Sequence, residues 1–125
     1  MMLRRLAGEY TVCKVSADAA AWTPFSFLSV TDSEVSLLCR TEDVPASVTA
    51  REDGWKGFRI EGQLEFSLVG VLYELSGILA KENIGIFVTS TYDTDYIFVK
   101  KENFARACDA LLRAGHIFTE ESAGE

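Results

Sequence analysis

Two short stretches of this sequence hold side chains that could bind a small molecule: residues 67–72 (SLVGVL) and residues 90–96 (STYDTDY). In the first stretch, Gly70 has no Cβ, so a ligand could lie close to the backbone there. If a helix starts at this point, the N–H groups of Val71 and Leu72 in its first turn are free to hold a carboxylate. The first stretch is therefore a candidate anion site.

The second stretch holds side chains that could bind a cation. Asp93 and Asp95 could accept charge-assisted hydrogen bonds from an ammonium or guanidinium group. The hydroxyl groups of Ser90 and Thr91 add neutral partners, and the ring of Tyr92 could cover an aliphatic chain. An α-amino acid carries both charges, so the two stretches together indicate an amino-acid site.

Each of these features also has an ordinary structural interpretation. A glycine such as Gly70 is expected where a strand ends or where a helix packs closely on a sheet. Residues 93–95 are of the types that turns prefer. Tyr92 and Tyr96 would flank such a turn and could pack at the edge of a sheet. The local pattern leaves both interpretations open.

The elements that must position these stretches follow from hydrophobic periodicity. Residues 64–68 alternate between apolar and polar side chains, as in a strand with one buried face. A helix follows, because apolar residues then recur with helical spacing at Val71, Leu72, Leu75, Ile78 and Leu79. Strands are predicted over 84–91 and 96–100, with a turn between them.

A second amphipathic helix and a last strand complete the pattern. The helix is indicated by the stripe Phe104, Ala107, Cys108, Leu111 and Leu112, and Gly115 stands just past its end. Residues 116–119 can form the last strand. The order strand, helix, strand, strand, helix, strand predicts an α+β fold of the ferredoxin-like βαββαβ type, with two helices on one face of an antiparallel sheet.

The first half of the sequence predicts strands without convincing helices. Strands are expected over 8–15, 25–30, 35–40, 48–52 and 55–60, with turns at 31–34 and 53–54, a weakly helical segment at 17–21 and one helical turn over 41–45. A sheet without helices must bury its apolar face against something else. We therefore expect two linked halves, joined near residues 57–62.

Composition favours a folded, acidic, cytoplasmic protein. The net charge of −7 makes nucleic acid and anionic membrane surfaces poor partners, and no segment approaches the roughly 20 apolar residues of a membrane span. The cysteines at 13, 39 and 108 form no C-x-x-C pair, so free thiols are expected. Disorder is expected only in the first few residues and in the tail 120–125.

No catalytic pattern stands out, and the sequence predicts neither an enzyme nor a bound cofactor. His116 is the only histidine, and there is no G-x-S-x-G, no G-x-G-x-x-G and no cluster of Cys and His. The carboxylates Glu61, Glu65 and Glu74 have the spacing of a solvated face.

The run from Phe66 to Lys100 resembles the ACT domain, a regulatory module attached to aspartate kinase and other amino-acid enzymes. The resemblance rests on Gly70-Val71-Leu72, on Ile84-Gly85-Ile86 and above all on the run 90–96. It extends to Val44-Pro45 and to 54–62, and so covers residues 8 to 118. The sequence is most similar to the stand-alone tandem-ACT family, which is also similar to the cytosolic arginine sensors of animals.

This resemblance implies two ACT-like repeats whose sheets pair side by side. The first, residues 1–60, would be reduced in its helices, and the second, residues 61–125, would be a complete βαββαβ domain. Ligands of this family bind between repeats, near the strand-to-helix loop and the following hairpin. Carried over to this chain, the binding positions are Ser67, Gly70, Val71, Leu72, Thr91, Tyr92, Asp93 and Asp95.

The implied function is a regulatory module that senses an amino acid. Because the arginine sensors have more repeats per chain, a complete site here could require a second subunit, and a homodimer is expected. Two alternatives stand beside the sensor: an association module without a ligand, and a separate regulatory partner of an enzyme of amino-acid metabolism.

Overall fold

The structure is a computed structural model and describes residues 1–16, 23–62 and 70–119. The chain divides into two units: unit 1 comprises Met1–Ala7 and Lys56–Glu125, and unit 2 comprises Gly8–Trp55. The division falls inside one strand, β5 (Ala50–Ile60). The repeats expected from the sequence, 1–60 and 61–125, have other bounds, and their assignment as repeats stays a prediction.

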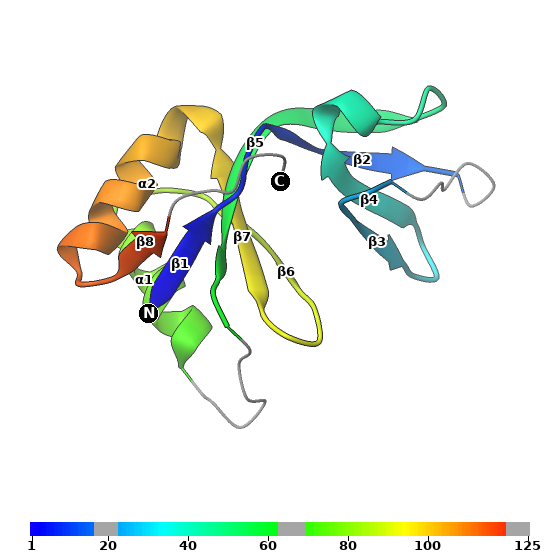
Figure 1. The fold of residues 1–125 in the computed structure, drawn as a ribbon. Helices are drawn as coiled ribbons and strands as arrows, with labels where there is room; N and C mark the ends of the chain where they lie inside the picture. The colour runs from blue at the N-terminus through cyan, green and yellow to red at the C-terminus, as the bar shows by residue number, and fades with distance from the viewer. Residues whose placement is uncertain (17–22, 63–69, 120–125) are drawn as a thin grey trace. The chain divides into compact units, whose positions relative to one another are not determined.

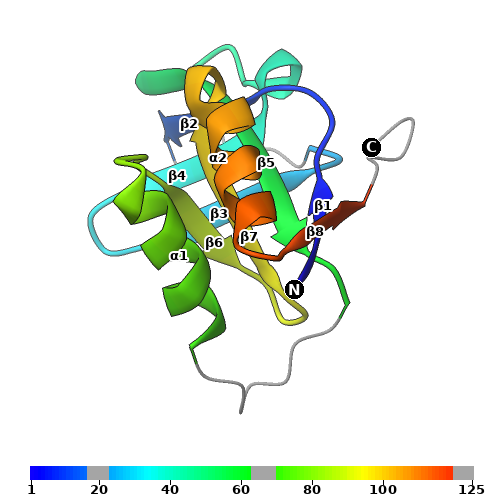
Figure 2. The same cartoon turned by 90° about the vertical axis from the view of Figure 1, so that its left-hand side faces the viewer.

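Unit 1 contains a mixed sheet with the strand order β6-β7-β5-β1-β8. Its strands besides β5 are β1 (Met2–Arg5), β6 (Phe87–Ser90), β7 (Asp95–Lys100) and β8 (Ile117–Thr119). The helices are α1 (Val71–Lys81) and α2 (Lys101–Arg113). Along the chain, β5-α1-β6-β7-α2-β8 gives a βαββαβ order in which β5 is the first strand, where the sequence predicted a strand over 64–68. Figure 2 shows both helices on one face of this sheet.

The core of unit 1 lies between the two helices and the sheet. Alternate residues of β5 and β7 point into it, and the predicted stripe of α1 faces them with Leu75 and Leu79 fully buried. Helix α2 contributes Ala107 and Leu111. The periodicity of 3.6 residues in the helices and of 2 in the strands therefore predicted this interface correctly. The strand expected over 64–68 lies outside the described residues.

Strand β1 corrects the expectation of a disordered start. It pairs antiparallel with β5 (Leu3 opposite Ile60) and parallel with β8 (Leu3 opposite Phe118), so it lies between the first and last strands of the βαββαβ order (Figure 1). The side chain of Leu3 is fully buried. The prediction of a wholly antiparallel sheet is therefore wrong at the pair formed by β1 and β8.

Strand β5 corrects a second expectation, the turn at Asp53-Gly54. The structure has one strand, Ala50–Ile60, where the sequence predicted two. The pairing of β5 with β2 shifts register between Tyr10 (opposite Trp55) and Val12 (opposite Glu52). Gly54 lies at this shift with a φ of +85°, as in a β-bulge with one extra residue in the strand. Asp-Gly favours a turn in general, but in this strand its glycine accommodates the bulge.

Unit 2 is a sheet of order β3-β4-β2-β5, to which β5 contributes its first half. Its other strands are β2 (Tyr10–Val15), β3 (Ser26–Val30) and β4 (Val35–Arg40), and a single 3₁₀ turn follows at Thr41–Asp43. These bounds confirm the predicted strands and the turn at 31–34. The weakly helical segment expected at 17–21 lies outside the described residues.

The three cysteines are free and buried. Cys13 and Cys39 share a small apolar core with Val15 and Leu37, and burial raises the pKa of Cys39 to about 11. Burial also raises the pKa of Cys108. The thiols therefore serve as small apolar side chains at neutral pH. None of the helices in the described ranges has the length and apolar character needed to cross a membrane.

Candidate functional site

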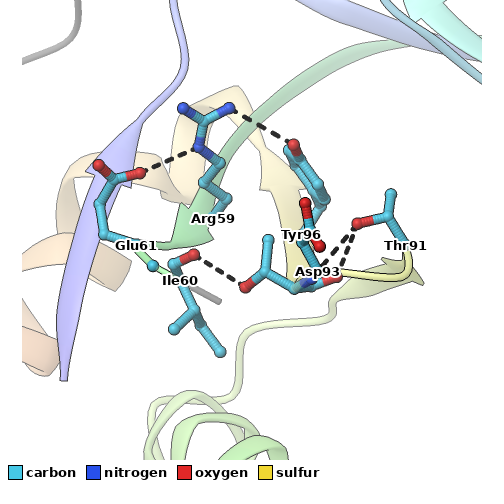
Figure 3. A pocket seen from close by; sticks show the side chains of 8 residues that line it. Arg59, Ile60, Glu61, Thr91, Asp93 and Tyr96 are labelled. Atoms are coloured by element: carbon cyan, nitrogen blue, oxygen red, sulfur yellow. Dashed lines mark hydrogen bonds and ion pairs between the residues drawn. The ribbon is translucent and has the colours of Figure 1, made fainter. Parts of the chain in front are cut away.

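A pocket of about 300 Å³ opens in unit 1 where β5 ends beside the β6–β7 hairpin. Its polar side chains are those of Arg59, Glu61, Thr91, Asp93, Thr94 and Tyr96 (Figure 3). Strand alternation places them: Phe58 and Ile60 face the core below the helices, so Arg59 points to the opposite face of the sheet. The pocket therefore lies on the face of the sheet opposite α1 and α2.

Arg59 is the central cation of the pocket. Its Nε donates a hydrogen bond to Glu61 Oε1 at 3.1 Å, and its Nη1 donates to the hydroxyl of Tyr96 at 3.4 Å. Arg4 Nε lies 3.2 Å from Glu61 Oε2, which makes an ion pair, although this contact is not directed as a hydrogen bond. One carboxylate is thus held between two guanidinium groups.

The hairpin that forms the other wall is anchored to β5. The backbone N–H of Thr91 donates to the carbonyl of Thr94 at 2.9 Å, and the N–H of Thr94 donates to the hydroxyl of Thr91 at 3.3 Å. The buried hydroxyl of Thr94 donates to the carbonyl of Ile60 at 2.8 Å. The sequence Thr-Tyr-Asp-Thr therefore forms a turn whose two threonines are occupied by the fold, which fixes the position of Asp93.

Asp93 is the exposed anion of the pocket. Among the residues that the structure describes, its carboxylate has no hydrogen-bond or ion-pair partner. The pocket thus presents a guanidinium group that already holds a carboxylate, and a second carboxylate that is open to a cation. This arrangement can bind a molecule with both charges.

Neighbouring charges shift two pKa values here. Partial burial by itself raises the pKa of Glu61, but the hydrogen bond from Arg59 and the nearby positive charges of Arg59 and Arg4 outweigh that effect, so the pKa is lowered. For Arg59 burial alone lowers the pKa, and the contacts with Tyr96 and Glu61 more than offset that effect. Both groups are therefore held in their charged forms.

The lowered pKa of Glu61 predicts a pH dependence of stability. Because the folded pKa lies below the unfolded value near 4.5, the stabilisation is complete above that value and is lost as the pH falls through the folded pKa. We expect Glu61→Gln to lower the free energy of unfolding by a few tenths to about 1 kcal/mol at pH 7, and by less at pH 3. Urea titrations at both pH values measure this difference. Asp109→Asn, at an exposed ion pair, is the control, and an equal effect of Glu61→Gln at both pH values would contradict the prediction.

The structure brings together only part of the predicted set of site residues. Thr91 and Asp93 line the pocket. Tyr92, at the tip of the hairpin, is 75% exposed, and Asp95 accepts a hydrogen bond from Ser90. Gly70 precedes α1 with a φ of +84°, and the neighbouring Val71 and Leu72 pack against the core, outside the lining of this pocket. Ser67 lies outside the described residues.

Four polar residues of the pocket were not predicted from the sequence: Arg59, Glu61, Thr94 and Tyr96. Glu61 was assigned to a solvated face, but in the structure it is ion-paired. The available signal was the alternation in residues 57–61, where two large apolar residues separate Gly57, Arg59 and Glu61. That pattern places a cation and an anion on the face opposite the core.

The fold and the sequence together assign the class of protein. A βαββαβ unit with both helices on one face belongs to the ferredoxin-like α+β domains. Residues 50–113 match the model of the ACT domain family, so the chain belongs to this family. ACT domains are regulatory modules. A search of curated proteins found no match.

Solved structures with the same fold include chains matched over most of their length and a part of a larger enzyme. A protein of Agrobacterium tumefaciens is 29% identical with a TM-score of 0.85, over 99% of this chain and 96% of that chain. A Vibrio cholerae protein of unknown function, described as a possible transport protein, is 22% identical with a TM-score of 0.64, over 87% and 85%. The aspartate kinase of Clostridium acetobutylicum, an allosteric enzyme, is 12% identical with a TM-score of 0.65, over 90% of this chain and 33% of that chain. At such low identities, the last two show a shared fold only.

Proposed function

We propose that this chain is a regulatory module without catalytic activity of its own, and that it binds an α-amino acid in the pocket of unit 1. The observation that carries the proposal is the hydrogen bond of 3.1 Å between Arg59 Nε and a Glu61 carboxylate oxygen. A ligand carboxylate can occupy the same donors, and the open carboxylate of Asp93 can accept the ligand ammonium group. The pocket volume suits a small molecule of this class.

Glu61 has a specific part in this proposal. It occupies Arg59 and Arg4 in the absence of a ligand, so a ligand carboxylate must displace it or share the guanidinium groups with it. The first turn of α1, with the N–H groups of Val71 and Leu72, remains an additional carboxylate site in the proposal. A second subunit could complete the ligand site, as the expected homodimer implies.

The direct test is a thermal-shift screen of the purified chain against each common L-α-amino acid at millimolar concentration. A ligand at a hundred times its dissociation constant stabilises the folded state by about 2.7 kcal/mol. We expect a response to one or a few amino acids, and we expect Arg59→Met and Asp93→Asn each to abolish it. Arg113→Met and Asp109→Asn are matched controls, because both residues are exposed on α2.

Two results of this screen would contradict different parts of the proposal. Asp93 is exposed, and its carboxylate has no hydrogen-bond or ion-pair partner among the described residues, so Asp93→Asn should unfold at the wild-type temperature without ligand. If a ligand stabilises wild type and Asp93→Asn equally, the ammonium part of the proposal is wrong. If no amino acid stabilises the wild type, the proposed function itself is wrong.

A second candidate function, association without a ligand, has an observation of its own. Strand β3 is the edge strand of unit 2, and its Leu28 and Val30 are 53% and 67% exposed. An exposed edge with apolar side chains can pair with a second chain. In this case Val30→Lys would turn a dimer into a monomer in sedimentation experiments, and the thermal-shift screen would give no response.

A further inference from the structure

The β3–β4 hairpin of unit 2 repeats the β6–β7 hairpin of unit 1, displaced by 60 residues. Phe27 to Val30 pair with Leu38 to Val35, and Phe87 to Ser90 pair with Phe98 to Asp95 in the same register. The N–H of Thr31 donates to the carbonyl of Glu34 at 3.0 Å, as the N–H of Thr91 does to Thr94 at 2.9 Å. The 3₁₀ turn then begins at residue 41 and α2 at residue 101.

The strand that pairs with each hairpin also corresponds. Strand β2 buries Cys13 and Val15 against Leu37 and Cys39 of β4. In unit 1, Phe58 and Ile60 are buried with Ile97 and Val99, which are the residues 60 positions after Leu37 and Cys39. Lys14 lies directly opposite Ser36. By the same correspondence Lys14 stands where Arg59 stands, and Ser36 stands where Tyr96 stands.

Unit 2 has a pocket of about 280 Å³ at these corresponding positions. It is lined by Lys14, Glu34 and Ser36, and by Arg51 and Glu52 of the neighbouring strand β5. Three of its positions (Lys14, Glu34 and Ser36) therefore match three positions of the first pocket (Arg59, Thr94 and Tyr96). The two pockets therefore lie at equivalent positions of the two hairpins.

The chemistry of the second pocket differs in a defined way. In the described part of the chain, the ammonium group of Lys14 has no hydrogen-bond or ion-pair partner, whereas Arg59 is already occupied by Glu61. Glu34 accepts a hydrogen bond from Ser36, and Glu52 adds a second carboxylate to the pocket. Serine in place of tyrosine removes an aromatic ring from the wall. The pocket thus offers two carboxylates, an arginine that is already paired with Asp53, and a lysine without a partner among the described residues.

We propose that this pocket is a second site for a small zwitterionic amino acid, so that each chain binds two ligand molecules. The ligand carboxylate contacts Lys14, and the ligand ammonium group contacts Glu34 and Glu52. Because the ligand class is taken from the first pocket, the proposal rests on the proposed function. The two sites differ in their cation, lysine against arginine, and are expected to differ in affinity, since lysine does not offer the bidentate fork of arginine.

The test is a residue-resolved titration of the full chain by ¹H–¹⁵N NMR, with each common L-α-amino acid as the probe. We expect shift changes around Lys14 and Ser36 and around Arg59 and Tyr96, with separate midpoints. Lys14→Met should remove only the first set, and Arg59→Met only the second. Lys81→Met, exposed at the end of α1, is the matched control. Ser36→Tyr is a second variant that fills the unit 2 pocket and retains Lys14.

The titration results separate the second site from the proposed function. Shift changes around Arg59 alone leave the proposed function intact and overturn the second site. Shift changes around Lys14 that disappear in both Lys14→Met and Ser36→Tyr support the second site, even where the pocket of unit 1 gives no response. Changes around Lys14 that persist in both variants overturn the assignment. No response in either unit overturns both proposals.

Discussion

Replacement of Leu3 by alanine is expected to lower the free energy of unfolding of unit 1 by about 2–5 kcal/mol. Leu3 is fully buried and belongs to the core with Phe58 and Ile60. Truncation removes apolar contact area and leaves a cavity under β1, and both effects add. Since domains are stable by only about 5–15 kcal/mol, the loss is a large fraction of the total. Urea unfolding followed by circular dichroism measures it.

The neighbouring residue provides the control. Met2 lies in the same strand, but its side chain is 49% exposed, so Met2→Ala is expected to change stability by no more than about 0.5 kcal/mol. Near-equal effects of the two substitutions would show that β1 is not part of the core. A loss of stability in Leu3→Ala but not in Met2→Ala would confirm that β1 packs on the core.

Gly57→Ala is expected to destabilise unit 1 by about 1–3 kcal/mol. A Cβ at this position would lie 2.5 and 2.6 Å from two ring carbons of Phe98 and 3.0 Å from the carbonyl oxygen of Ile97. Phe98 is fully buried and cannot swing into solvent. The absence of a side chain at Gly57 therefore allows β5 and β7 to hold this ring between them, and thermal unfolding of the variant measures the cost.

Gly77→Ala is the opposite case and the matched control. Gly77 lies inside α1, and a Cβ there would meet nothing within 4 Å. Alanine favours the helix by about 0.5–1 kcal/mol over glycine. The same chemical change is thus expected to stabilise at position 77 and to destabilise at position 57. If Gly57→Ala were neutral, the ring of Phe98 would have to occupy another position.

The sequence predicted the elements of the second half well because their periodicity is strong. The stripe of α1 begins and ends within the residues that the structure assigns to the helix. Strand β1 was missed because four residues with two arginines show no period, and only pairing to β5 and β8 makes them a strand. The strand β5 was divided wrongly because Asp-Gly favours a turn in isolation, whereas neighbouring strands hold it here in a bulge.

The sequence predicted the part of the candidate site that lies in the β6–β7 hairpin, but not the part that lies on β5. The hairpin run 90–96 stood out because clustered polar residues between apolar strands are visible in a sequence. Arg59 was not predicted, because its place in the pocket depends on residues of other strands. Tyr96 of β7 accepts its hydrogen bond, and Arg4 of β1 shares Glu61 with it. Side-chain networks of this kind depend on register between strands, which local sequence does not determine.

The place of β1 in the sheet has a consequence for the order of events during synthesis. β1 precedes all of unit 2 in the chain, yet its two neighbours are β5 and β8, the latter ending at Thr119. Strand β1 can therefore pair with β5 only after Gly8–Trp55 has been synthesised, and with β8 only after α2 has followed. Unit 2 is contiguous in sequence and can form early. Unit 1 closes last, around a strand whose contacts are among the most distant in the chain, and such contacts slow folding.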